Sequence, residues 1–228
     1  MNMLAIDTST NWLTVAVGDE TVCKRSFSQS IGNRHAEQLA VIVRELMTGL
    51  ALETSALDAV GVVVGPGSFT GLRVGISFAQ GLALPLGVRT VAINALDALS
   101  HQASGLSGQR ISPLIDARKG QVYAALYNVG QGHPIPASPQ VAMAPAEWLS
   151  GLPKGTLVIG NGVETYREMI RHDCRHLVML EENIITISPP NLYKLCTVAV
   201  AAGETLDPGG LEACYIRQAD AVCQKDGI

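Results

Sequence analysis

Apolar runs separated by turn residues open the chain and predict short strands. Three such runs lie at residues 3–6, 13–17 and 21–27. Gly18-Asp19 separates the last two and suits a tight hairpin. Residues 34–50 then repeat apolar side chains at helical spacing, which predicts an amphipathic helix. The continuous apolar run 59–64 predicts a strand buried at the centre of a sheet.

A glycine-rich segment follows that strand and opens a second helix, expected over 70–84. It reads Gly65-Pro66-Gly67-Ser68-Phe69-Thr70-Gly71-Leu72-Arg73-Val74-Gly75. A strand, a glycine turn and a helix place backbone N–H groups where an anion or a partner's acidic group can dock. The candidate docking residues are Gly65, Gly67, Ser68 and Thr70. Two nucleotide motifs are excluded, because Leu72 replaces the lysine of a P-loop and Thr70 the third glycine of a dinucleotide fingerprint.

A strand at 90–93 and a helix at 95–103 complete the order β-β-β-α-β-α-β-α, which is typical of a ribonuclease H-like lobe. We therefore expect an N-terminal lobe at 1–103, completed by a helix at about 191–203. A polar linker at 104–109 separates it from a smaller lobe at 110–190, which opens again with strand, turn and strand. Residues 204–228 form the expected tail.

Within the smaller lobe, strands are expected at 111–115, 122–127 and 156–159. The proline-rich stretch 133–145 predicts a loop, and Gly160-Asn161-Gly162 a turn before a helix at 163–171. The tail is expected to hold a last strand at 212–216.

Composition and charge narrow the class of protein. The 228 residues are 47% apolar and 16% charged, with a net charge of −4. This acidic balance disfavours a protein that binds nucleic acid alone through a broad basic face. The five cysteines form no C-x-x-C pair, which argues against a zinc knuckle or a disulfide framework. These scattered cysteines, odd in number, fit a reducing compartment, so we expect a cytoplasmic protein. No apolar run is long enough to cross a membrane.

Several segments resemble the TsaB (YeaZ) family of bacterial tRNA threonylcarbamoyladenosine biosynthesis proteins, which are paralogues of the TsaD/Kae/Qri family. The matching segments are Ala5–Thr10, Gly65–Gly75, Gln80–Ala83 and Ile115–Tyr123, with a weaker match at Cys214–Arg217. The glycine segment with its helix is the most specific of these, and together they span nearly the whole chain.

The resemblance implies an α/β protein with the actin-like ATPase fold, in which two ribonuclease H-like lobes hold mixed sheets flanked by helices. It also implies a non-catalytic subunit needed to make N6-threonylcarbamoyladenosine (t6A) at adenosine 37 of tRNAs that read codons starting with A. Such a subunit pairs with and activates the transferase TsaD, helps to recruit the ATPase TsaE and forms a homodimer when alone. It contacts tRNA only indirectly and has no cofactor of its own. It binds ATP or ADP only within the assembled complex.

Small side chains along the second helix point to close packing. Gly71, Gly75, Ala79 and Ala83 recur every four residues and form a ridge that lets another element approach closely. The ridge suits a partner and suits the chain's own sheet equally well. On the first helix, Val41 and Met47 lie outside the main apolar stripe, which indicates a second neighbour.

The resemblance places the partner interface on these two helices. The candidate interface residues are His35, Gln38, Leu39, Ile42, Gly71, Gly75, Phe78, Ala79 and Leu82. Leu82→Glu or Ala79→Arg is expected to abolish pairing with TsaD while the monomer stays folded.

An independent actin-like ATPase or carbamoyl-transfer enzyme is the alternative. Actin-like ATPases hold phosphate and Mg²⁺ at the first turn of each lobe, so a vestigial nucleotide cleft would use Asp7, Thr8, Ser9, Asp116 and Lys119. However, no glycine follows Asp7, and the bulky Trp12 lies nearby. Productive phosphoryl transfer needs phosphate-gripping donors on both turns. We therefore expect the cleft to be degenerate.

The sequence also holds candidate residues for metal binding, proteolysis and RNA contact. Ala95 and Leu99 stand where TsaD carries its metal-binding histidines, so no metal is expected there. His172, Cys174 and His176 have ligand spacing, but the neighbouring Arg171 and Arg175 favour a solvated basic face. No Ser-His-Asp or Cys-His order supports proteolysis. Arg167 joins Arg171 and Arg175 in a possible RNA-contacting stripe if one helix carries all three.

Overall fold

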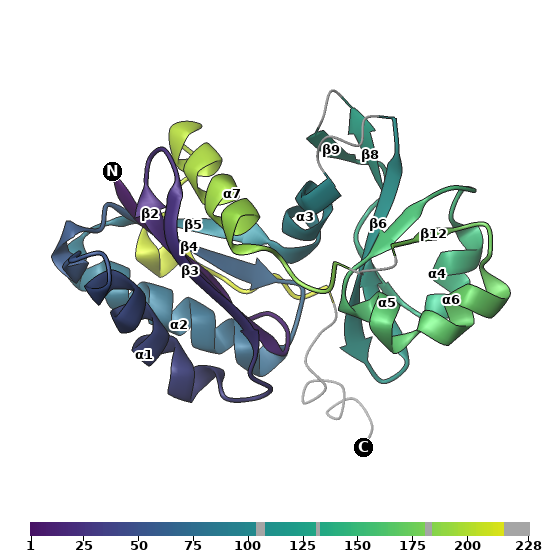
Figure 1. The fold of residues 1–228 in the computed structure, drawn as a ribbon, viewed down its shortest axis with the longest axis horizontal. Helices are drawn as coiled ribbons and strands as arrows, with labels where there is room; N and C mark the ends of the chain where they lie inside the picture. Colours follow the sequence, from purple (N-terminus) through teal and green to yellow (C-terminus); the bar gives the residue numbers. More distant parts are fainter. Residues whose placement is uncertain (104–107, 131–132, 181–183, 217–228) are drawn as a thin grey trace, which may run out of the picture. The chain divides into compact units, whose positions relative to one another are not determined.

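The computed structural model describes residues 1–103, 108–130, 133–180 and 184–216. The chain divides into two compact units (Figure 1). Unit 1 comprises Met1–Ala98 and Ile187–Ala213, and unit 2 comprises Leu99–Thr186 and the residues from Cys214 on. The boundary at residue 98 lies five residues before the expected one, inside helix α3 (Ala95–Ser100). The residues expected as a separate tail are divided between the two units at Cys214.

Unit 1 is built on a five-stranded sheet in the order β3-β2-β1-β4-β5. Its strands are β1 (Asn2–Asp7), β2 (Trp12–Asp19), β3 (Cys23–Ser30), β4 (Ala59–Gly65) and β5 (Arg89–Asn94). The first three are antiparallel neighbours, while β4 runs parallel to β1 and β5. Every residue of β4 is buried, as its continuous apolar sequence predicts for a central strand.

Helices cover both faces of this sheet. Figure 1 shows α1 (His35–Thr48) and α2 (Phe69–Leu86) on one face and α7 (Pro189–Ala201) on the other. Two short 3₁₀ turns, η1 (Thr54–Ala56) and η3 (Pro208–Gly210), lie in the connections. The core on the α1–α2 face is formed by aliphatic side chains of the sheet and both helices, among them Leu4, Ile6, Val62, Leu39 and Leu72.

Unit 2 repeats the strand order of unit 1. The path β10-β7-β6-β11-β12 has antiparallel neighbours at β10, β7 and β6 and parallel neighbours at β6, β11 and β12. Its strands are β6 (Arg110–Arg118), β7 (Gln121–Ala124), β8 (Tyr127–Gly130), β9 (His133–Pro136), β10 (Val141–Met143), β11 (Leu157–Ile159) and β12 (Val178–Met179). Off this path, β8 pairs with β6 and β9.

The helices of unit 2 are short. They are η2 (His101–Ala103), α4 (Pro145–Gly151), α5 (Asn161–Thr165) and α6 (Arg167–Asp173). Both units thus have the strand order and directions of a ribonuclease H-like lobe. The predicted α/β fold of two such lobes, with mixed sheets flanked by helices, is confirmed.

Five local predictions were wrong, and unit 2 holds four of them. The expected strand 122–127 is divided, because β7 ends at Ala124 and β8 begins at Tyr127. The expected loop 133–145 contains β9 and β10, because proline is tolerated in edge strands. Gly160-Asn161-Gly162 opens α5 at Asn161, and the expected helix 163–171 breaks at Tyr166, which is neither in α5 nor in α6. Part of the linker expected at 104–109 and Arg217 lie outside the described residues.

The fifth wrong prediction is the strand at 212–216, which is irregular chain in the structure. The Gln80 side-chain amide donates to the carbonyls of Pro208 and Leu211, at 3.1 and 3.3 Å. The backbone just before the expected strand is thus bound by a side chain of α2. Earlier in the same segment, Leu206 forms an isolated antiparallel bridge with Thr90 of β5.

Candidate functional site

The chain that leaves β1 is locked onto the start of α2. Thr8 Oγ1 donates to the Gly71 carbonyl at 2.8 Å, and the Ser68 N–H donates to the Ser9 carbonyl at 2.7 Å. The Ser68 side chain caps α2 by accepting the Gly71 N–H at 3.2 Å. The amides of Ser68, a candidate for anion docking, and of Gly71 therefore have partners within the chain.

Glycine is required in this contact because the two backbones approach so closely. A Cβ on Gly67 would collide with the Ser9 carbonyl, and a Cβ on Gly71 with the Thr8 carbonyl. On Gly75 it would meet the Thr8 hydroxyl. Gly65 and Gly67 thus shape a turn that packs on the chain itself, while Thr70 is exposed.

The small-residue ridge of α2 faces the core of unit 1. Gly71 and Gly75 are buried, and Ala79 and Ala83 are fully inaccessible. In the folded monomer the ridge therefore packs within the chain, and Gly71 and Gly75 lie against Thr8, just after β1, where only small side chains fit. The assignment of Gly71, Gly75 and Ala79 to a partner interface stays a prediction.

Three candidates on α1 also point inward. The exposed fractions of His35, Leu39 and Ile42 are 5%, 1% and 9%. His35 Nε2 lies 3.2 Å from the Trp12 carbonyl, within hydrogen-bond distance. Their spacing of four and three residues places them on one helix face, which packs on the sheet. In the monomer they thus belong to the interior of unit 1, and their assignment to the partner interface stays a prediction.

The remaining candidates lie where α1 and α2 meet the surface. Gln38, Phe78 and Leu82 are half-buried. Phe78 and Leu82 line a cavity of about 370 Å³, the α1–α2 groove, together with Ala40, Val43, Arg44, Met47, Thr48, Ala51, Leu52, Glu53 and Thr54.

Most residues of the groove were missed by the sequence analysis. Met47 was noted because it lies outside the main stripe, yet it is 2% exposed and belongs to the core as well. Leu52, Glu53 and Thr54 come from the connection after α1, where helical periodicity gives no signal. The groove has an apolar lining with Arg44 and Glu53 among its residues, an arrangement that suits a partner's apolar side chains.

Asp7 ends β1 in a closed environment. Its Oδ1 accepts the Ser9 N–H at 2.8 Å, while its Oδ2 and the Ser9 Oγ are buried without a hydrogen-bond partner among the described residues. Burial raises the pKa of Asp7 above its usual value, against smaller opposing effects of Ser9 and of the nearby His35. Asp7, Thr8 and Ser9 therefore act as a buried structural cluster in unit 1.

Asp116 and Lys119 belong to unit 2, where Asp116 lies near the end of β6 and Lys119 in the turn before β7. Asp116 Oδ1 accepts the Arg118 N–H at 2.9 Å, and the Asp116 N–H donates to Asn161 Oδ1 at 3.1 Å. Arg118, Lys119 and Gly120 have positive φ values of 62°, 52° and 73°. Asp116 thus holds a turn of unusual backbone conformation. A cleft that joins Asp7 to Asp116 stays a prediction.

A family model described as TsaD: tRNA N6-adenosine threonylcarbamoyltransferase matches residues 26–214. The tRNA threonylcarbamoyladenosine biosynthesis protein TsaB of Bacillus subtilis is 31% identical over 173 residues, 75% of each chain. The chain belongs to the TsaB family.

Further comparisons agree with this membership. TsaB of Escherichia coli is 26% identical over 95% of each chain. A Pseudomonas aeruginosa protein described as similar to peptidase YEAZ is 30% identical, with a TM-score of 0.80 over 95% of this chain and 99% of its own. YeaZ from the same organism is 28% identical, with a TM-score of 0.78 over 94% and 99%. The predicted family and its actin-like fold are confirmed.

The candidate metal ligands in the histidine segment of this TsaB-family chain differ in their exposure. Cys174 is buried, whereas His172 is exposed and lies 3.7 Å from Glu168. The described residues contain no group of three His, Cys, Asp or Glu side chains placed to hold a metal ion. Ala95 and Leu99, in the place of the TsaD histidines, are buried in α3.

The arginine stripe is also interrupted. Helix α6 ends at Asp173, so Arg175 lies beyond it. Arg167 forms an ion pair with Glu164, and Arg171 lies 3.5 Å from Glu168. The condition for a continuous basic stripe, one helix through all three arginines, is therefore not met.

No helix in the described ranges has both the length and the apolar character that a membrane span requires.

Proposed function

We propose that this chain is a non-catalytic subunit of t6A biosynthesis that binds and activates the transferase TsaD through the α1–α2 groove. Its TsaB relatives are named as tRNA threonylcarbamoyladenosine biosynthesis proteins, and the matching family model is that of TsaD. The product would be t6A at adenosine 37, and the pair would help to recruit the ATPase TsaE. The same groove would allow homodimers in the absence of TsaD.

The α1–α2 groove is the observation that carries the proposal. Phe78 and Leu82 of α2 and Val43 and Met47 of α1 give it an apolar lining beside the charged Arg44 and Glu53. An apolar centre with polar residues around it is the usual anatomy of a protein interface. Activation would follow from helix packing that stabilises the active geometry of TsaD.

A role without catalysis is supported by the loops after β1 and β4. The amides of Ser68 and Gly71 bind the chain's own oxygen atoms, and Asp7 is buried. A nucleotide-binding turn needs such amides free for phosphate. We accordingly propose that the chain has no cofactor of its own, and that it meets ATP or ADP and tRNA only within the assembled complex.

The test compares two matched variants of α2. Leu82→Glu places a carboxylate in the groove and should abolish co-elution with TsaD and t6A formation by the reconstituted complex. Leu84→Glu introduces the same group two residues away, where the side chain is 59% exposed and outside the groove, and should leave both unchanged.

Two results would contradict the proposal. One is unchanged affinity of Leu82→Glu for TsaD, and the other is ATP turnover by the isolated chain. Ala79→Arg is unsuitable for this test, because Ala79 is fully buried and the substitution would disrupt the core of the monomer.

A further inference from the structure

Strand β3 forms an edge of the sheet in unit 1. Among the described residues it pairs with β2 alone. It is eight residues long and contains neither proline nor glycine. The irregularity in its register with β2 lies at Lys24, where Arg25 pairs with Val17 and Cys23 with Gly18, so the ladder is regular from Arg25 to Ser30. Natural edge strands are commonly blocked by proline, by a bulge or by charged side chains, since an open edge is a template for another strand.

The register shows which backbone groups of β3 point away from β2. The Ile31 N–H donates to the Asn11 carbonyl at 3.0 Å, directly beyond the pair Trp12 and Ser30. Hydrogen-bonded and non-hydrogen-bonded pairs alternate along an antiparallel ladder. Gln29 and Phe27 therefore bond to β2.

The intervening residues form the free edge, which we call the serine edge. It consists of Ser26, Ser28 and Ser30, whose N–H and C=O groups point away from β2. No backbone hydrogen bond from these three residues to the rest of the described chain is present on that side.

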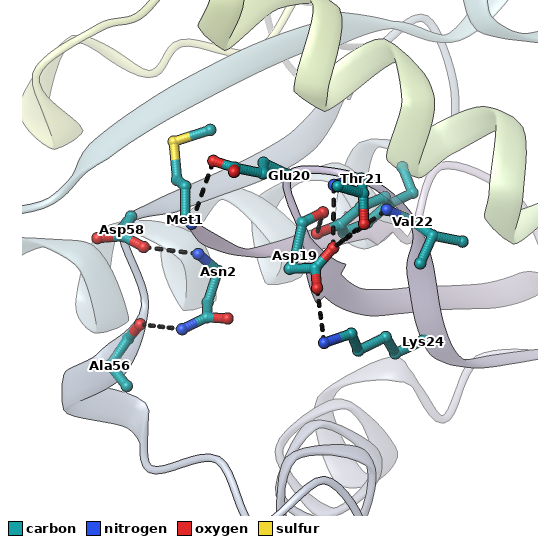
Figure 2. Close-up of polar contacts among 10 residues, drawn as sticks. Met1, Asn2, Asp19, Glu20, Thr21, Val22, Lys24, Ala56 and Asp58 are labelled. Carbon is teal, nitrogen blue, oxygen red and sulfur yellow. Dashed lines mark hydrogen bonds and ion pairs between the residues drawn. The ribbon is translucent and has the colours of Figure 1, made fainter.

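The two cations of β3 are held within unit 1. Lys24 Nζ lies 2.6 Å from Asp19 Oδ2, in the turn that Figure 2 shows. The same carboxylate accepts the N–H groups of Thr21 and Val22, and its hydrogen bond with Lys24 is the main cause of its lowered pKa. Lys24 is therefore engaged at the turn before the serine edge.

Arg25 is engaged on the other side of its strand. Its guanidinium fills the space that a Cβ on Gly49 would need, at the C-terminal end of α1. A cation is favourable there because of the helix dipole. The stretch from Ser26 to Ser30 carries no charge of its own, so charge does not block the edge.

We propose that the serine edge pairs with the serine edge of a second copy of this chain, antiparallel about a two-fold axis at Ser28. In this register Ser28 faces Ser28 of the partner copy, and Ser26 faces Ser30. The edge is self-complementary because the backbone N–H and C=O groups of all three serines point outward, and their small side chains bring no charge to the edge. The Ser28 hydroxyl itself lies 3.0 Å from Thr14 Oγ1 of β2. Because of the two-fold symmetry, each serine edge is covered by the other, and no third copy can pair at that edge. This pairing is separate from the α1–α2 groove.

The experiment measures self-association in a Leu82→Glu background, which removes pairing through the groove. Sedimentation equilibrium from micromolar to millimolar concentration should show a monomer–dimer equilibrium. Ser28→Pro deletes an N–H that β2 does not use, and with it two hydrogen bonds at the axis. It should raise the dissociation constant by about ten- to hundredfold.

Two charge variants separate the edge from general effects of charge. Ser28→Lys puts two ammonium groups opposite each other and should also abolish the dimer. Gln29→Lys adds the same charge at the next residue, whose backbone bonds to β2. Because residue 29 faces Phe27 of the partner copy, no two lysines come opposite each other, and the dissociation constant should stay unchanged. If the circular dichroism spectrum of the Ser28→Pro monomer differs from that of the wild type, the variant is misfolded. The dissociation constant of Ser28→Lys then serves as the test of the edge.

Amide hydrogen exchange gives a residue-level readout. The amides of Ser26, Ser28 and Ser30 should gain protection with protein concentration, whereas those of Phe27 and Gln29 should be protected at every concentration. A chain that stays monomeric throughout, a dimer unaffected by Ser28→Pro and Ser28→Lys, or concentration-dependent protection confined to another surface would each overturn the proposal. TsaD binding is measured separately, so failure here leaves the function proposed above intact.

Discussion

Thr8 and Gly71 lie in direct contact, with the Thr8 hydroxyl donating to the Gly71 carbonyl at 2.8 Å. The contact joins the end of β1 to the first turn of α2 and leaves no room for a Cβ at Gly71 or Gly75. The glycine segment, the most specific sequence feature of the chain, thus ties a helix to its own sheet. Its position then fixes where Phe78 and Leu82 reach the surface.

Gly75→Ala should destabilise the protein although alanine is the better helix former. The new methyl group would meet the Thr8 hydroxyl, and overpacking of this kind costs about 1–3 kcal/mol. Gly81→Ala is the matched control, because its Cβ would enter open space and should stabilise the helix by about 0.5–1 kcal/mol. Urea unfolding of both variants measures the difference. Equal effects at the two positions would show that Thr8 does not restrict the helix.

Asp7→Asn should stabilise the protein at neutral pH. The folded-state pKa of Asp7 is raised above 3.8, so folding favours the protonated carboxyl. The wild type therefore loses stability as pH rises from the unfolded-state pKa through the raised folded-state pKa. Asparagine has no charge to desolvate, so the advantage of the variant should grow across this window and then stay constant. Urea unfolding from pH 4 to 8 tests this, and an advantage that shrinks as pH rises would contradict the assigned shift.

Gln80→Leu should loosen the chain after α7. The Gln80 amide donates to two backbone carbonyls, Pro208 and Leu211, and leucine of similar size can replace neither bond. We expect a loss of about 1–3 kcal/mol in the free energy of unfolding. Backbone amides around Leu206 should exchange hydrogen faster than in the wild type. The ranking of exchange rates among the amides of β4 should stay the same. Unchanged exchange around Leu206 would show that the clamp is dispensable.

Reversing the charges of Arg171 and Arg175 should leave tRNA binding by the assembled complex unchanged. Arg171 already faces Glu168, and Arg175 lies beyond the end of α6, so the two form no continuous phosphate-binding stripe. Affinity and its salt dependence, measured by filter binding, should both match the wild type. A shallower salt slope would instead show that these side chains contact phosphates.

Local patterns determined much of the fold. The apolar run at 59–64 predicted the buried β4, and the spacing of Leu39 and Val43 predicted α1. Both predictions worked because the spacing of apolar residues along the sequence follows the period of the strand or helix. The irregular regions were predicted less well. Tyr166 breaks an expected helix, and proline-containing β9 was expected to be a loop, because pairing with β8 supplies a partner that local sequence does not reveal.

The sequence alone determined the family, the two-lobed architecture and the need for small residues along α2. Only the tertiary structure decided which neighbour that ridge meets: the atoms of Thr8 fill the space beside Gly71 and Gly75, so Ala79 and the ridge face inward while Phe78 and Leu82 reach the groove. A periodic pattern records that one helix face is tightly packed. It does not record whether the packing partner belongs to the same chain or to another, because small side chains suit both equally.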